Sequence, residues 1–165
     1  MSLIVGISGK IGTGKTSIAN FLHEMGAVDQ VTAFGDVLKR EVAHRFNFDL
    51  ELCYSGKDQV IFHADLPNGT MSVRQILQWY GTDICRALDS QYWVKRMEEE
   101  IEGLEEEARI PDIRLAIHDV RFKEEAQWVA DRGGVLVRVQ PYPGWEPGDH
   151  AGHRSETDLD DWGEL

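Results

Sequence analysis

The sequence has little of what would tie a protein to a membrane or to an oxidising compartment. Its 165 residues include two cysteines, Cys53 and Cys85, which lie far apart and show neither metal-ligand spacing nor a disulfide framework. No apolar run reaches the roughly 20 residues that cross a bilayer. The first residues form an apolar run and a glycine-rich segment rather than a signal peptide. We therefore expect a soluble cytoplasmic protein with no membrane partner.

Positive charge is also scarce in this sequence. The 17 Lys and Arg residues are outnumbered by 29 Asp and Glu residues, so the formal net charge at pH 7 is -12. Such a surface repels nucleic acid, and we expect no nucleic-acid partner. The acidic run EEEIEGLEEE keeps helical apolar spacing through Met97, Ile101 and Leu104. Its glutamates are therefore expected to coat the solvent face of a helix.

Short apolar runs alternate with helical patterns along the chain. The patterns predict strands at 3–7, 31–34, 114–120 and 135–140, and helices at about 15–25, 37–46, 72–88, 91–108 and 122–132. This alternation is typical of an α/β fold in which helices cover both faces of a parallel sheet, a three-layer αβα sandwich. We expect one domain over residues 1–165. Within it, residues 36–110 are mostly helical and residues 141–165 form a loop and tail.

The clearest motif lies close to the N-terminus. Gly9, Gly14, Lys15 and Thr16 fit the pattern G-x-x-x-x-G-K-[ST], between a predicted strand and a predicted helix. The glycines allow the backbone N–H groups to turn toward a phosphate, and the start of the helix adds unpaired N–H groups. We predict that Lys15 binds the β and γ phosphates of ATP or GTP and that the Thr16 hydroxyl binds Mg²⁺. The predicted nucleotide-binding residues are Gly9, Lys10, Ile11, Gly12, Thr13, Gly14, Lys15, Thr16 and Ser17.

The stretch SVRQILQWYGTDICR carries groups suited to a second ligand. At 100° per residue, Arg74, Gln78, Gly81 and Cys85 fall on one line along the border of the apolar face. An arginine can grip a phosphate with two N–H bonds, and a glutamine can pair with a base edge. Gly81 would leave room for a flat ligand. The spacing equally fits a surface helix whose arginine pairs with a carboxylate.

Two further groupings carry charge at the expected ends of elements. Asp36, Lys39 and Arg40 lie at positions i, i+3 and i+4 of a predicted helix, where they are either ligand-binding groups or a helix cap and two solvated bases. Asp119 and Arg121 follow a buried strand in LAIHDVRF. There they could hold Mg²⁺ through water and neutralise a moving phosphoryl group, or form a salt bridge at the end of the strand.

Taken together, these segments resemble a known family. GKIGTGKT, FGDVLKR, SVRQILQWYGTD, QYWVK, HDVRF and HRSE are similar, in this order, to the motifs of bacteriophage-type deoxynucleoside monophosphate kinases. The resemblance implies the nucleoside monophosphate kinase fold with a P-loop, ATP as donor, a deoxynucleoside monophosphate as acceptor, and a homodimer. It places Lys15, Asp119 and Arg121 at the reaction centre. It places Asp36, Lys39, Arg74, Gln78 and Arg86 around the acceptor, and gives no role to His153, Ser155 and Glu156.

The sequence is also compatible with three other functions. Similar P-loop kinases of phages phosphorylate 5-hydroxymethyluracil in DNA, and a dephospho-coenzyme-A-like kinase is a further variant. A nucleotide switch is the alternative from another class. The guanine-binding pattern N-K-x-D does not occur in the sequence, and the D-x-x-G match at Asp131 closes a predicted helix instead of following a strand.

Overall fold

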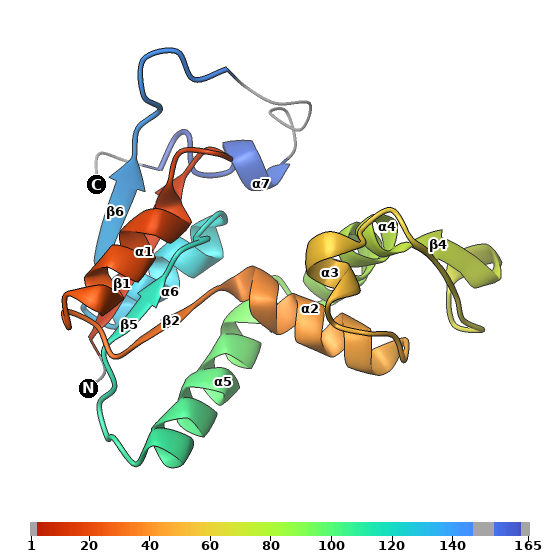
Figure 1. The fold of residues 1–165 in the computed structure, drawn as a ribbon, viewed down its shortest axis with the longest axis horizontal. Helices are drawn as coiled ribbons and strands as arrows, with labels where there is room; N and C mark the ends of the chain where they lie inside the picture. Colours follow the sequence, from red (N-terminus) through yellow and green to blue (C-terminus); the bar gives the residue numbers. More distant parts are fainter. Residues whose placement is uncertain (1–2, 147–153, 163–165) are drawn as a thin grey trace. The chain divides into compact units, whose positions relative to one another are not determined.

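The computed structural model describes residues 3–146 and 154–162, and the chain divides into two compact units (Figure 1). We call the first the sheet unit; it contains the described residues up to Phe34 and from Glu98 onward. The second, the helical unit, is the continuous segment Gly35–Met97. The chain passes from one unit to the other near the start of α2 (Phe34–Arg45) and within α5 (Tyr92–Ala108).

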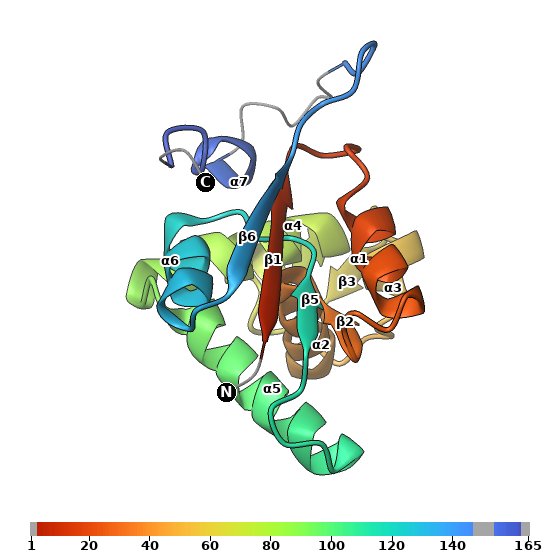
Figure 2. The same ribbon diagram turned by 90° about the vertical axis from the view of Figure 1, so that its left-hand side faces the viewer.

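Four parallel strands form the centre of the sheet unit. They are β1 (Ile4–Gly9), β2 (Gln30–Thr32), β5 (Leu115–Ile117) and β6 (Val135–Val139), in the order β2-β5-β1-β6. The crossovers from β1 to β2 and from β5 to β6 run in opposite directions across the sheet. Right-handed crossovers therefore place α1 (Lys15–Glu24) and α6 (Lys123–Asp131) on opposite faces, as Figure 2 shows. This arrangement confirms the predicted α/β fold with a parallel sheet between helical layers.

The core of the sheet unit lies under α1. Ile7, Ala19, Val28 and Ala116 form a fully buried cluster, against which Ile18 and Leu22 of α1 pack. All three residues of β5 are buried, as expected of a central strand covered on both faces. On the other face, Glu98 of α5 accepts a hydrogen bond from Trp128 Nε1 (3.0 Å), and Arg132 pairs with the same carboxylate.

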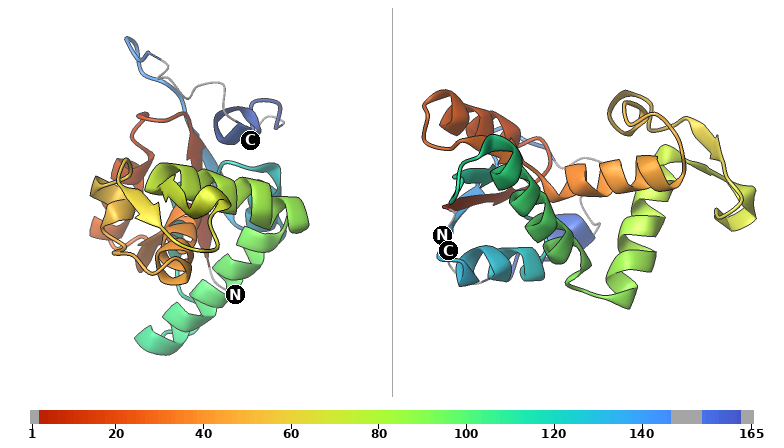
Figure 3. Two further views of the ribbon diagram at one scale, coloured as in Figure 1. Left: turned by 90° about the vertical axis from the view of Figure 1, so that its right-hand side faces the viewer. Right: turned by 90° about the horizontal axis from the view of Figure 1, so that it is seen from below.

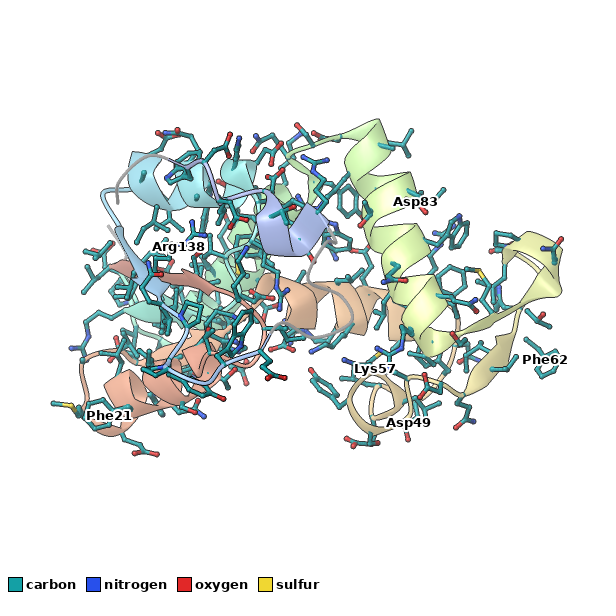
Figure 4. All side chains as sticks on the ribbon, turned by 90° about the horizontal axis from the view of Figure 1, so that it is seen from above. Phe21, Asp49, Lys57, Phe62, Asp83 and Arg138 are labelled. Atoms are coloured by element: carbon teal, nitrogen blue, oxygen red, sulfur yellow. The ribbon has the colours of Figure 1, made fainter. Side chains whose placement is uncertain are left out.

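The helical unit follows one continuous stretch of chain (Figure 3). After α2 come α3 (Leu52–Ser55), the hairpin of β3 (Val60–Phe62) and β4 (Thr70–Ser72) with η1 (Pro67–Gly69) between them, then α4 (Val73–Gln78) and the π-helix η2 (Trp79–Arg86). Ser72 caps α4: its hydroxyl accepts from Gln75 N–H, and Gln75 Oε1 accepts from Ser72 N–H. Phe62 projects from the hairpin with 78% of its surface exposed (Figure 4).

A half-buried carboxylate joins three helices inside the helical unit. Glu41 of α2 accepts hydrogen bonds from Tyr80 of η2 (2.7 Å), from Tyr92 of α5 (2.5 Å) and from Arg96 of α5 (2.8 Å). Burial, followed by the hydrogen bond to Glu41, raises the pKa of Tyr92 to about 12, and the same causes raise the pKa of Tyr80. Both phenols therefore stay protonated and keep donating at neutral pH.

Three expectations about local structure were wrong. Asp36 does not cap a helix, because α2 already begins at Phe34, whose N–H donates to Asp119 Oδ1 at 2.7 Å. The strand expected at 31–34 accordingly ends at Thr32. The helix expected at 72–88 changes to π-helical pitch at Trp79, so a spacing of 100° per residue does not hold beyond α4.

The sequence patterns also missed some elements. The β3–β4 hairpin and α3 lie in a stretch that showed no clear period. In the region expected to be loop and tail, residues Arg154–Thr157 form the short helix α7, and Leu159 just after it is buried. Part of that region is therefore packed within the sheet unit.

Candidate functional site

The loop between β1 and α1, residues 9–16, has the shape of an anion-binding loop. Gly9 has φ +144°, and a Cβ on it would lie 2.7 Å from the carbonyl oxygen of Val139. Gly14 adopts a left-handed conformation (φ 90°) at the N-cap of α1, so no side chain caps this helix, and its first turn carries no acidic residue. The start of α1 therefore presents backbone N–H groups and the positive end of its helix dipole to a negatively charged ligand.

The Lys15 side chain lies inside this loop. It is 7% exposed, and its Nζ donates to the Lys10 carbonyl oxygen at 2.6 Å. Thr13 donates to the same carbonyl through its hydroxyl at 2.8 Å and through its N–H at 3.4 Å. Trp145, which follows β6, donates its Nε1–H to the Ile11 carbonyl oxygen at 2.9 Å. These contacts fix the curl of the loop and hold the Lys15 ammonium group inside it.

The end of β5 brings polar side chains to the same edge of the sheet. β5 pairs in parallel with β1, so both strands end on the same edge, where ligands bind in sheets of this kind. His118 Nδ1 lies 3.3 Å from the Thr16 hydroxyl oxygen, and Asp119 accepts the N–H of Phe34. Arg121 lines a small cavity together with Gly9 and Lys10. The structure thus brings the predicted residues Thr16, Asp119 and Arg121 to the edge that carries the loop.

The C-terminal segment contributes an acidic group to the same region. Asp160 pairs with Lys10 of the loop and with Arg138 of β6, which is labelled in Figure 4. Ser155 of α7 also lines the cavity beside Arg121. His153 lies outside the described residues, as does the side chain of Glu156, so two of the three positions in the HRSE motif have no structural description.

In the helical unit, two predicted acceptor residues form a cluster with a tyrosine. Asp36 Oδ1 accepts hydrogen bonds from Lys39 Nζ (2.8 Å) and from the Tyr54 hydroxyl (2.9 Å). The Lys39 ammonium group also lies 4.1 Å from the centre of the Tyr54 ring. Burial and the hydrogen bond to Asp36 raise the pKa of Tyr54 to about 12, so its hydroxyl stays a donor at neutral pH.

The other predicted acceptor residues do not form one line. Arg74 and Gln78 are exposed on α4, and Arg74 Nε lies 3.3 Å from Asp58 Oδ1. Gly81 is buried in the π-helix, where an added Cβ would lie 3.0 Å from the Leu38 side chain. A large side chain at this position would therefore press on Leu38 of α2. Arg86 is partly buried at the end of η2.

Several residues of these clusters were not predicted from the sequence. Tyr54 and Asp160 lie in segments without a recognisable pattern, so nothing in the sequence marked them. His118 directly precedes Asp119 in HDVRF, and its place next to a site residue was a usable signal. Within residues 3–146 and 154–162, no group of three or more His, Cys, Asp or Glu residues is arranged to hold a metal, and no helix is long and apolar enough to cross a membrane.

Comparison with known proteins identifies the family. The family model described as deoxynucleotide monophosphate kinase matches residues 48–159. This chain belongs to the deoxynucleotide monophosphate kinase family. The match confirms the resemblance read from the motifs, and it makes the protein a kinase, and so a transferase, for which nucleotide substrates are implied.

Two relatives extend this result. The kinase is 27% identical over 173 residues to a protein of Acanthamoeba polyphaga mimivirus named "Putative deoxynucleotide monophosphate kinase", an alignment that covers 95% of this chain and 82% of the relative. It is also 35% identical over 65 residues to the dephospho-CoA kinase of Vibrio cholerae serotype O1. That similarity covers only 39% of this chain and 31% of the relative.

Proposed function

We propose that this kinase transfers the γ-phosphate of ATP to a deoxynucleoside 5′-monophosphate and releases ADP and a deoxynucleoside diphosphate. The observation that carries the proposal is the uncapped start of α1 behind a glycine loop that holds a buried lysine. A triphosphate is the ligand that such a loop fits best. The family match supports a deoxynucleoside monophosphate as the acceptor.

On the donor side, the N–H groups of residues 9–17 would bind the β and γ phosphates, and Lys15 would leave the Lys10 carbonyl to pair with their oxygens. The Thr16 hydroxyl and the Asp119 carboxylate are oxygen donors on one edge of the sheet, which is the kind of ligand that Mg²⁺ takes. When bound there, Mg²⁺ would neutralise charge on the phosphates. Arg121 would stabilise the charge that develops on the transferred phosphoryl group.

On the acceptor side, the charged groups of the helical unit would hold the monophosphate. Lys39 and Arg74 suit its phosphate, and Gln78 suits a base edge. Asp36 orients Lys39 through their hydrogen bond. Arg86 completes the proposed set of acceptor-binding residues. Gly81, which was predicted to belong to it, packs against Leu38.

The reaction needs positioning more than covalent chemistry. An oxygen of the acceptor phosphate would bond to the γ-phosphorus while the bond from that phosphorus to the β–γ bridging oxygen breaks. Both phosphate groups carry negative charge, so the reaction requires cations around them and the exclusion of water. Lys15 and Arg121 supply that charge from this chain.

A coupled assay tests the proposal. ADP formation is measured with ATP and Mg²⁺ and with each deoxynucleoside monophosphate in turn, and dephospho-coenzyme A and oligonucleotide DNA serve as separate acceptors. We expect turnover with one or more monophosphates and none with the other two. Turnover with dephospho-coenzyme A alone would instead support the activity for which the Vibrio cholerae relative is named.

Lys15→Ala provides the control for the donor site. We expect kcat to fall on the order of a thousandfold, because a charge that acts on the transferred phosphate is removed. Circular dichroism should show the same helix content as for the unchanged protein. Full activity of this variant would remove the loop from the mechanism.

A further inference from the structure

One carboxylate occupies a site between two cations at the edge of the glycine loop. Asp160 Oδ1 lies 2.6 Å from Lys10 Nζ and 2.8 Å from Arg138 NH2, and Asp160 Oδ2 lies 2.8 Å from Lys10 Nζ. The Arg138 guanidinium also donates to the carbonyl oxygen of Leu159. Two positive side chains from different parts of the chain thus converge on one anion.

The register of the sheet places this anion site beside the loop. Arg138 of β6 lies opposite Ser8 of β1, the residue directly before Gly9. Lys10 belongs to the loop itself. Both cations line the same small cavity as Arg121. The site is therefore part of the edge at which the phosphates of a nucleotide would lie.

A carboxylate and a phosphate bind to the same N–H donors of these two cations. Arginine and lysine bind both anions through charge-assisted N–H···O bonds of similar length. The Lys10 hydrogen bond, with help from Arg138, keeps the pKa of Asp160 below its usual value, so its carboxylate is fully charged at neutral pH. It therefore competes with any phosphate for the same donors.

We propose that Asp160 occupies a phosphate-binding site, from which the triphosphate of ATP displaces it and takes Lys10 and Arg138 as ligands. Arg138 is then a further nucleotide-binding residue outside the loop motif, and Asp160 lowers the affinity of the empty enzyme for ATP. This inference rests on the proposed function, because it assumes that the loop binds ATP.

The rest of the C-terminal segment can stay in place when Asp160 releases Lys10 and Arg138. Lys123 donates its N–H to Asp158 Oδ2 at 3.0 Å, and its ammonium group pairs with Asp161 at 2.8 Å. Leu159 is 5% exposed. These contacts hold the segment on α6 independently of Lys10, so the exchange needs only a change in the Asp160 side chain and its immediate backbone.

Calorimetric titration with ATP and with inorganic triphosphate tests the proposal. Asp160→Asn removes the competing charge and should lower the Kd of both ligands by roughly threefold to tenfold, because a competing occupant reduces apparent affinity. Asp161→Asn is the matched control. It makes the same chemical change one residue away, at a carboxylate that pairs with Lys123, and should leave both Kd values unchanged. In the Asp160→Asn background, Arg138→Gln should raise both Kd values by on the order of tenfold.

Other results would overturn the proposal. Asp160→Asn with an unchanged or higher Kd for ATP would show that the carboxylate only anchors the segment. An Arg138→Gln change without effect in that background would remove Arg138 from the phosphate site. Thermal unfolding without ligand shows whether each variant is folded, and ATP should raise the unfolding temperature of Asp160→Asn more than that of the unchanged protein. If the unchanged protein binds no ATP, the proposed function fails as well; if it binds ATP and Asp160→Asn matches Asp161→Asn, only this inference fails.

Discussion

Tyr54 shows how one hydroxyl can organise a charged cluster. It donates to Asp36, which also accepts from Lys39, and its ring lies under the Lys39 ammonium group. Tyr54→Phe keeps the ring and removes only the hydroxyl. If Asp36 and Lys39 hold the acceptor, the KM for the monophosphate should rise about fivefold to tenfold, since the net contribution of a typical hydrogen bond is about 1–1.5 kcal/mol. Steady-state kinetics with varied acceptor at saturating ATP measures this.

Tyr142→Phe is the control for that experiment. It makes the same chemical change at an exposed tyrosine of the sheet unit. Its KM for the acceptor should stay unchanged, and the Kd of ATP should stay unchanged in Tyr54→Phe. Equal acceptor KM values for Tyr54→Phe and the unchanged protein would show that the cluster around Asp36 does not serve the acceptor.

Gly81 in the π-helix η2 lies close to the side chain of Leu38 in α2. A Cβ on Gly81 would lie 3.0 Å from Leu38 Cδ2, so a side chain there must push the end of Leu38 aside. Gly81→Ala should be nearly neutral, because alanine favours a helix and the leucine is flexible. Gly81→Val should lower the free energy of unfolding by about 1–3 kcal/mol through overpacking. Urea unfolding measures both.

Leu38→Ala separates this packing effect from a role in binding. Combined with Gly81→Val, it should recover part of the lost stability, because the added methyl groups then occupy the space that Leu38 leaves. Additive losses in the double variant would show that the valine disturbs η2 by another route.

The edge strand β2 is held to β5 by an ion pair that depends on pH. Asp29, just before β2, binds the Arg114 guanidinium at 2.6 Å and 3.1 Å and the Arg114 N–H at 2.9 Å. These bonds lower the pKa of Asp29 from 3.8 to about 2. Because the pKa of the folded state is the lower one, the stabilisation is fully present above pH 4 and is lost as the pH falls toward 2.

Asp29→Asn should therefore be less stable than the unchanged protein at pH 7 and nearly equal to it at pH 2. Urea unfolding at a series of pH values checks the convergence. Asp83→Asn, a change at an exposed side chain of η2 (labelled in Figure 4), is the control for the chemical change itself. A gap between Asp29→Asn and the unchanged protein that persists at pH 2 would contradict the assignment.

The elements differ in how much of them the sequence could predict. β1, α1 and the loop between them follow from local rules, because glycine freedom and helical spacing act within a few residues. The π-helical pitch of η2 could not be predicted, since it depends on how Tyr80 and Trp93 pack: Tyr80 reaches Glu41, and Trp93 Nε1 donates to the Gly81 carbonyl. The approach of Asp160 to Lys10 joins residues 150 positions apart, and no local pattern encodes it.

At the scale of the whole molecule, the net charge of -12 argues against DNA as the phosphate acceptor. A surface with this excess of carboxylates repels the phosphate backbone of DNA. We expect no measurable binding of duplex DNA at 150 mM salt, as judged by the fluorescence anisotropy of a labelled oligonucleotide. Binding that weakens steeply with added salt would contradict this and would favour a kinase that acts on bases in DNA.

The strand order β2-β5-β1-β6 also has a consequence for how the chain is made. β1 pairs with β5 and β6, and β2 pairs with β5; these two partner strands begin at Leu115 and Val135. During translation, more than a hundred further residues must therefore be added after β1 before its partner strands leave the ribosome. At about 5–20 residues per second this takes several seconds or more. Gly35–Met97 is complete before β5 begins at Leu115. We expect the helical unit to fold first on the growing chain, while the first strand depends on chaperones to keep it from aggregating.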